Sequence, residues 1–285
     1  MITTFFKIVH SKASSIRCLS GNTLKIIALT CMVIDHVTKV FYSSIAGRII
    51  NPALVQGSIS LTQLDMIHFI YDDILCGIGA IAFPIFAFLF AEGFYYTTNK
   101  KKFLIRLIIF ALISEFPFDT TFFRPWGPTT PDWPWYRFHQ NIFFTYAQAF
   151  CTLWLIQQTS KVKNKKVSFS LNLLIIGISC YLSHSFIMGD YGIFGILLIL
   201  TAYGLRNNRL HQIVGSLIIK ILFSGHDYLS SFLISLILIL MYNGKRGKCA
   251  HKYFFYIFYP AHIALLGLLD WFIFVVLWGV NNLVV

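Results

Sequence analysis

Apolar runs, most of them near membrane-spanning length, follow one another through most of this 285-residue chain and constrain its fold more than any other feature. An α-helix rises about 1.5 Å per residue, so about 20 residues cross the roughly 30 Å hydrocarbon core of a bilayer. The runs that we expect to cross it are 24–42, 74–97, 103–118, 141–158, 169–187, 191–205, 210–224, 228–243 and 253–281. Several are short, which indicates tilted or broken helices. The sequence therefore predicts an all-α polytopic transmembrane bundle of nine spans, or ten if the last run splits at Pro260.

The composition agrees with a membrane protein and excludes several other classes. Hydrophobic residues make up 57% of the chain and charged residues 12%, which is too apolar for an ordinary soluble domain. The formal net charge is +12, but the basic residues fall between the apolar runs, so we expect membrane lipids and no nucleic acid as partners. The six cysteines form no C-x-x-C pair, and neither a metal site nor a disulfide framework is expected.

The distribution of lysine and arginine predicts the orientation of the chain. When alternate connections are grouped, most of these residues fall on one side, at 7–25, 100–106, 161–166, 206–209 and 245–252. Cytoplasmic loops are enriched in Lys and Arg. Residues 1–23 are therefore expected to form a cytoplasmic N-terminal segment, and 24–285 a single transmembrane domain without appended modules.

Two connections on the opposite, extracytoplasmic side are long. Residues 43–73 include Asp65, His68, Asp72 and Asp73 among apolar neighbours and are expected to contain an interfacial helix. Residues 119–140 hold four prolines and three tryptophans. Prolines prevent a regular helix and tryptophans favour the membrane interface, so this segment is either a lid over an outward-facing cavity or a plain interfacial loop.

Asp35 and His36 lie inside the first span, where ionisable groups are costly and normally face a protein interior or a wet cavity. Lys25 lies eleven residues before His36, which is close to three turns and about 16 Å along the same helix face. One interpretation makes Lys25 an interfacial lysine and lets Asp35 and His36 satisfy each other. The other is a proton-transfer site beyond a mouth that attracts anions.

Further polar residues of the spans and their ends are candidates for the same site. They are Glu92 in the second span, Arg106, Glu115 and Asp119 in and after the third, Asn141 and Thr145 at the start of the fourth, Asp190 before the sixth and His262 just after Pro260. For Glu115, Asp119 and Asp190, a helix cap or a solvated loop residue is an equally open interpretation. For His36, Glu92 and His262, which lie well inside spans, function is favoured.

The chemistry that fits these residues is transfer of a group from a polyanionic cytoplasmic donor to an acceptor outside. There is no G-x-S-x-G, P-loop, G-x-G-x-x-G or H-E-x-x-H pattern. Acetyl-CoA suits the basic cytoplasmic rim, where Lys25 and Arg106 would hold its phosphates. His36 would take a proton from an amine or hydroxyl, and Asp35 or another carboxylate such as Glu115 would orient the imidazole.

Several runs together resemble the TraX family of integral membrane proteins, whose namesake is the conjugative F-pilin acetylase. They are LKIIALTCMVIDHV, AFPIFAFLFAEGFYYT, RLIIFALISEFPFD, NIFFT, DYGIFGILLIL and KYFFYIFYPAHIALLGLL. The first run also resembles the opening helix of acyltransferase-3 proteins, whose L-R-x-x-A…H pattern matches Leu24, Lys25, Ala28 and His36, with Lys25 in place of the arginine. In those families the histidine is the proposed catalytic residue.

This resemblance implies an acetyl-CoA-dependent acyltransferase of a bacterial cytoplasmic (inner) membrane, with a pilin-like subunit as acceptor. Its catalytic residues would be His36, Asp35 and Glu115, and its substrate-binding residues Glu92, Asp119, Asn141, Thr145, Asp190 and His262. Lys25 and Arg106 would bind the donor. The alternatives are an acyltransferase for a cell-surface glycan or small molecule, a proton-coupled transporter with Asp35, His36 and Glu92 as relay, and a non-catalytic assembly factor.

Overall fold

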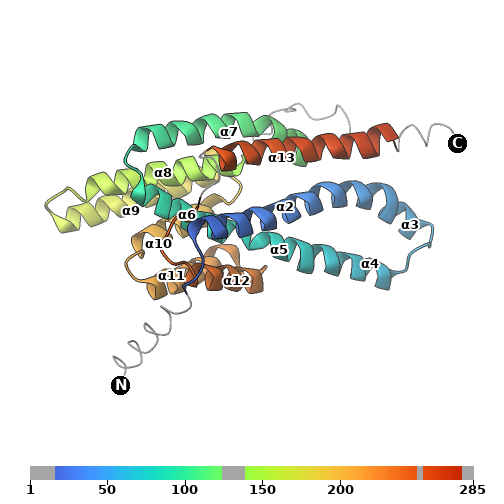
Figure 1. Ribbon diagram of the computed structural model, residues 1–285, viewed down its shortest axis with the longest axis horizontal. Helices are drawn as coiled ribbons and strands as arrows, with labels where there is room; N and C mark the ends of the chain where they lie inside the picture. Colours follow the sequence, from blue (N-terminus) through green and yellow to red (C-terminus); the bar gives the residue numbers. More distant parts are fainter. Residues whose placement is uncertain (1–16, 124–138, 249–252, 278–285) are drawn as a thin grey trace, which may run out of the picture. The chain divides into compact units, whose positions relative to one another are not determined.

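The computed structural model describes residues 17–123, 139–248 and 253–277, and the described chain is all-helical without a strand (Figure 1). Its α-helices are α2 (Gly21–Ile45), α3 (Asn51–Val55), α4 (Leu61–His68), α5 (Gly77–Ala80), α6 (Ala82–Tyr96), α7 (Lys100–Phe122), α8 (Ile142–Thr159), α9 (Lys165–Leu182), α10 (Gly192–Gly204), α11 (Arg209–Ser224), α12 (Leu229–Leu240) and α13 (Phe254–Trp271). Wider π-helical turns extend or join them at η1 (Ala46–Ile50), η2 (Phe69–Cys76), η3 (Ser183–Ile187) and η4 (Phe272–Leu277). The all-α prediction is confirmed.

Three helices of the described chain are long and apolar enough to cross a membrane: Leu61–Tyr96, Lys165–Ile187 and Phe254–Phe274. They contain or overlap three of the predicted spans. The other predicted spans also coincide with helices, and α2 has 25 residues, among them Lys25, Asp35 and Lys39. The number of crossings stays a prediction.

Two predicted boundaries differ from the structure. The helix that contains the second predicted span begins before residue 74, because a capping box at Ser60 and Gln63 starts it. It runs to Tyr96 through the π-helical turns of η2 and a turn at Ile81. The loop predicted at 119–140 also begins later, since α7 continues through Asp119 to Phe122. The prolines and tryptophans of that loop lie at 125–135, outside the described residues.

The described contacts group the chain into two compact units that each combine distant parts of the sequence. Unit 1 is Met1–Phe86, Thr120–Phe122 and Tyr228–Val285, and unit 2 is Ala87–Asp119 and Phe123–Asp227. The single transmembrane domain expected at 24–285 stays a prediction.

In unit 1, α2 and α13 lie side by side and run in the same direction (Figure 1). His36 bonds His262 and Ser44 bonds Asp270, so a step of eight residues on one helix matches a step of eight on the other. The helix that contains α4 and α5 runs the opposite way, because Tyr42 stacks on Tyr71 and Asp35 packs on Gly79. The helix α12 also runs opposite to α2, since Leu19 bonds Met241 where α2 begins and α12 ends.

In unit 2, consecutive helices reverse direction. Phe103 and Phe110 on α7 contact Phe150 and Phe143 on α8, in reverse order. The pairs Gln148–Ser179 and Thr159–Asn172 show the same for α8 and α9, and the pairs Gln212–Ala202 and Lys220–Phe194 for α10 and α11. The rings of Phe94 and Phe150, both fully buried, meet edge to face in its core.

The parallel course of α2 and α13 leads to a prediction about topology. If both helices cross the membrane, they cross it in the same direction. Successive crossings alternate in direction, so the number of crossings from α2 through α13 is then odd. The predicted number of nine spans agrees with this. Exposed Cys18 precedes α2, and Leu277 ends η4 after α13. A variant that keeps only Cys18 and a cysteine-free variant with Leu277→Cys should react with a membrane-impermeant maleimide from opposite faces of oriented vesicles.

A cysteine at Lys102, an exposed residue in the first turn of α7, is the matched control and should react from the same face as Cys18. Reaction of Cys18 and Leu277→Cys from one face would contradict the odd number of crossings.

Candidate functional site

Two imidazoles meet inside unit 1 where α2 lies against α13. The Nδ1 atom of His36 lies 2.7 Å from Nε2 of His262, and the two rings are parallel within 3°. The other ring nitrogen of His262, Nδ1, lies 2.8 Å from the carbonyl oxygen of Phe258, one turn earlier on α13. His262 is 8% exposed and His36 is half-buried. The structure thus brings together two residues that the sequence predicted separately, with His262 as the partner of His36.

Aromatic rings flank this pair. The edge of the His36 ring meets Phe122, with ring centroids 5.2 Å apart, and Tyr259, with centroids 6.1 Å apart. Phe258 stacks on His262. These rings limit the access of water to the imidazoles and hold their planes, which is the kind of support that a proton-transferring group requires.

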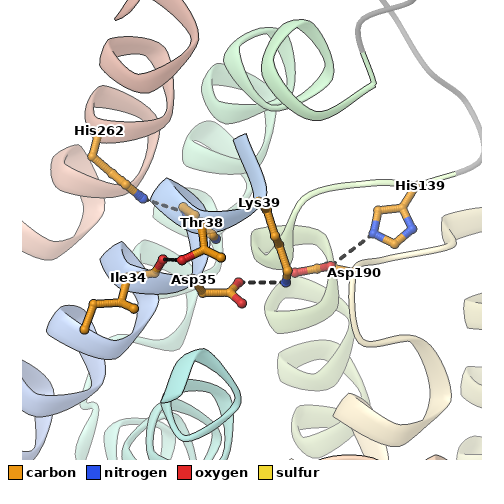
Figure 2. Close-up of polar contacts among 8 residues, drawn as sticks. Ile34, Asp35, Thr38, Lys39, His139, Asp190 and His262 are labelled. Atoms are coloured by element: carbon orange, nitrogen blue, oxygen red, sulfur yellow. Dashed lines mark hydrogen bonds and ion pairs between the residues drawn. The ribbon is translucent and has the colours of Figure 1, made fainter. Parts of the chain in front are cut away.

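The ion pair that the structure gives Asp35 is with Lys39, so the expected role of Asp35 in orienting the imidazole of His36 stays a prediction. Consecutive residues of a helix point about 100° apart, so neighbours do not face each other. Asp35 instead accepts a hydrogen bond of 2.7 Å from Lys39, one turn later on α2 (Figure 2). Its side chain also packs against the backbone of Gly79, where a Cβ atom would not fit. The hydrogen bond that orients His36 comes from His262.

A second polar pair joins the same two helices and was missed by sequence reasoning. The hydroxyl of Ser44 donates a 2.6 Å hydrogen bond to Asp270, and both side chains are buried. The sequence could have indicated Asp270, because it is an ionisable residue inside the last apolar run and such residues normally have a polar partner. The pair lies two turns, or about 12 Å, beyond the imidazoles along the helices.

In unit 2, a buried carboxylate meets the start of α8. Asn141 is the N-cap of this helix, and both its backbone N–H and its side-chain amide donate to Oε2 of Glu115. Positive partial charge at a helix N-terminus favours such a carboxylate. Glu115 is 5% exposed, and among the described residues its other oxygen, Oε1, has no hydrogen-bond partner. Asp119 follows one turn later on the same face and is 2% exposed.

The remaining candidates of unit 2 that the sequence predicts to be extracytoplasmic lie around the segment before α10. Asp190 pairs with His139 at 3.0 Å (Figure 2). The backbone N–H of Gln140 donates to the carbonyl of Met188. Thr145, fully buried, packs against the backbone of Gly189, which has no side chain to block this approach. His139 was not among the predicted site residues, although its position before Asn141 could have indicated it.

Cations and aromatic rings gather in unit 2 at the connections from α6 to α7 and from α10 to α11. The Arg206 guanidinium lies 3.2 Å from the centroid of Tyr95 and 3.7 Å from Glu92, so the predicted substrate-binding residue Glu92 faces an arginine. Lys100 lies over Phe94 and donates to its carbonyl oxygen, and burial lowers the pKa of Lys100. Arg106 lies 5.5 Å from Phe103.

Lys25, the other expected donor-binding residue, belongs to unit 1 and lies 5.1 Å from the ring of Phe255. Lys25 and Arg106 therefore occupy different units. Within the described residues, no group of three or more His, Cys, Asp or Glu side chains could hold a metal ion.

Comparison with known proteins gives two matches. Residues 20–270 match the family described as TraX protein. The chain is also 25% identical, over 263 residues, to a protein of Dichelobacter nodosus described as "Probable fimbrial assembly protein FimC, serogroup H1", and the match covers 87% of this chain and 94% of that protein. No solved structure matches.

The double role of Asn141 can be tested by comparing it with a simple N-cap. We expect Asn141→Ala to destabilise the protein more than Asn164→Ala, the N-cap of α9, which binds only backbone N–H groups. Loss of a cap costs about 1 kcal/mol, and removing a partner of a buried carboxylate adds about 1–3 kcal/mol. Thermal unfolding in detergent measures both. Equal effects would contradict the role of Asn141 in holding Glu115.

Proposed function

Since this chain belongs to the TraX family, we propose that it is an acetyltransferase of a bacterial cytoplasmic (inner) membrane that moves an acetyl group from acetyl-CoA to an extracytoplasmic acceptor. The proposed acceptor is the N-terminal amine of a pilin-like subunit. The family match and the similarity to a fimbrial assembly protein support the acceptor. The observation that carries the proposed chemistry is the half-buried imidazole of His36, held by the hydrogen bond to His262.

In the proposed reaction, the amine nitrogen attacks the thioester carbonyl, the new C–N bond forms and the C–S bond breaks. His36 takes a proton from the amine and delivers it to the departing CoA sulfur, so the imidazole ends as it began. Histidine suits both steps because an imidazole can accept a proton on one ring nitrogen and give it up again. In this proposal Asp35 acts on His36 only indirectly, through its ion pair with Lys39.

The carboxylates of unit 2 support an amine rather than a hydroxyl as acceptor. A free amine is mostly protonated at neutral pH and carries a positive charge. Glu115 offers a buried oxygen without a described partner, and Asp119 lies one turn away. We propose that Glu115 and Asp119 bind the acceptor's ammonium, with Asn141 fixing Glu115, and that one of the two carboxylates accepts one proton from it. The neutral amine that remains has the lone pair that attacks the thioester, and its second proton passes through His36 to the CoA sulfur. Thr145 and Asp190 are proposed to line the same acceptor site in unit 2.

On the donor side, Lys25 and Arg106 are proposed to bind the phosphates of acetyl-CoA. Both lie beside aromatic rings at helix ends on the side that the sequence predicts to be cytoplasmic. Glu92 is proposed to act on the donor through Arg206, which it faces. The same pairing weighs against the proton-coupled transporter, because Glu92 and Asp35 each lie beside a cation and a relay through them would break both ion pairs.

The reaction is tested with purified protein, labelled acetyl-CoA and a peptide that has the free N-terminus of a pilin-like subunit. His36→Ala should lower label transfer by about 100-fold or more, since a general base contributes roughly 10²–10⁴ in rate. His184→Ala changes an exposed histidine and should leave transfer unchanged. A peptide with a blocked N-terminus should accept no label.

Full transfer by His36→Ala would overturn the proposal. Transfer of label to a glycan but not to the peptide would make a glycan the acceptor in place of the pilin-like subunit. Proton-dependent flux without label transfer would support the transporter. Normal pilus assembly in cells with His36→Ala would support a non-catalytic assembly factor.

Donor binding gives a separate prediction. Lys25→Glu and Arg106→Glu should each weaken CoA binding by about tenfold, roughly 1.4 kcal/mol, and binding should fall more steeply with salt in the native protein than in either variant because ionic strength screens charge pairs. The exposed lysine variant Lys163→Glu, on the same predicted side, is the control. Unchanged affinity in either test variant, by calorimetry, would remove that residue from the donor site.

A further inference from the structure

We propose that His262 is a positioning residue that determines which nitrogen of His36 acts as the base, namely Nε2. This inference rests on the proposed function for its catalytic meaning. The assignment of the nitrogen itself follows from three groups in a row: the carbonyl of Phe258, the ring of His262 and the ring of His36.

The assignment begins at the carbonyl of Phe258. A carbonyl oxygen can only accept a hydrogen bond. Nδ1 of His262 lies 2.8 Å from this oxygen, so Nδ1 carries the hydrogen and donates it. A neutral imidazole has one N–H and one lone pair. Nε2 of His262 is therefore a lone-pair acceptor.

The same argument continues to His36. Its Nδ1 lies 2.7 Å from Nε2 of His262. Because Nε2 of His262 accepts, Nδ1 of His36 is the donor and carries the hydrogen. The lone pair of neutral His36 is then on Nε2, for which the described residues provide no hydrogen-bond partner. The nitrogen that remains available for a substrate proton is the one on the far side of the ring from His262.

The two other arrangements are less favourable. If His36 carried its hydrogen on Nε2, two lone pairs would face each other at 2.7 Å. If His262 were protonated on both nitrogens, it would donate to His36 and force the hydrogen of His36 onto Nε2, which would leave no base. That state places an additional charge on a side chain that is 8% exposed and packed among Phe258 and Tyr259, which is costly.

This arrangement also explains how the imidazole can accept a proton in the proposed reaction. When Nε2 of His36 takes the proton of the amine, the ring becomes positive and its Nδ1–H bond to His262 becomes charge-assisted, which strengthens it. His262 thus has the role that a buried carboxylate has in a Ser-His-Asp triad, but it adds no net charge to the interior. The proton leaves again from Nε2 to the CoA sulfur.

The second polar pair of these helices provides the matched control. Ser44 and Asp270 join α2 and α13 in the same register but lie two turns from the imidazoles. Ser44→Ala breaks this link and leaves the imidazole chain intact. A loss of activity that arose only from weaker packing of α2 on α13 would appear in Ser44→Ala as well.

The experiment compares three purified full-length variants in the acetyl-transfer assay. His262→Leu removes the acceptor and should lower kcat by about 100-fold with the KM for acetyl-CoA unchanged. His262→Gln can accept from Nδ1 of His36 through its side-chain oxygen and should lose no more than about tenfold. Ser44→Ala should keep the native kcat. Nitrogen-15 NMR of histidine-labelled protein should show His36 protonated at Nδ1, and this signature should be lost in His262→Leu.

Equal losses in His262→Leu and His262→Gln, a native kcat in His262→Leu, or a His36 resonance with the proton on Nε2 would overturn the inference. The NMR measurement separates it from the proposed function: if the native protein transfers no acetyl group, that function fails, while the protonation of His36 still decides the role of His262.

Discussion

The contact between α2 and α13 is the constraint on which the candidate site depends. An imidazole inside an apolar helix requires a partner, because an unpaired polar group away from water costs several kcal/mol. The chain meets this requirement with a second imidazole from the far end of the sequence, and that imidazole is in turn held by the carbonyl of its own helix. Two turns further along the same helices, Ser44 and Asp270 form a second buried hydrogen bond between α2 and α13. Polar pairing therefore fixes both the direction and the register of the two helices.

The same rule applies to the charges of the interior. Asp35 faces Lys39, Glu92 faces Arg206, and Glu115 faces the start of α8. Each carboxylate thus has a positive partner within its own unit, either a side chain or the N–H groups of a helix N-terminus. Oε1 of Glu115 is different, because it has no hydrogen-bond partner among the described residues. For this reason Glu115, rather than the other two carboxylates, is proposed as an acceptor-binding residue.

The sequence predicted the helices well because membrane-spanning length is a local property of the chain. It predicted less well where a helix continues through polar residues, as at Asp119, or begins at a cap inside a segment of mixed polarity, as at Ser60. The pairing of His262 with His36 could not be predicted, because it depends on which residues of two helices meet. A hydrogen bond between residues 226 positions apart has no effect on the local periodicity of the sequence. By contrast, helix geometry alone predicts that the adjacent side chains of Asp35 and His36 point in different directions.

The distance along the chain between the two imidazoles affects how the protein matures. During synthesis α2 emerges before α13, so His36 has no His262 to bond until 226 further residues have been made. Contacts between such distant residues also form late in folding, because a long loop must close first. The imidazole pair is thus incomplete until α13 has been made. A nascent or truncated chain that lacks α13 already has the imidazole of α2, but it lacks the ring that orients this imidazole.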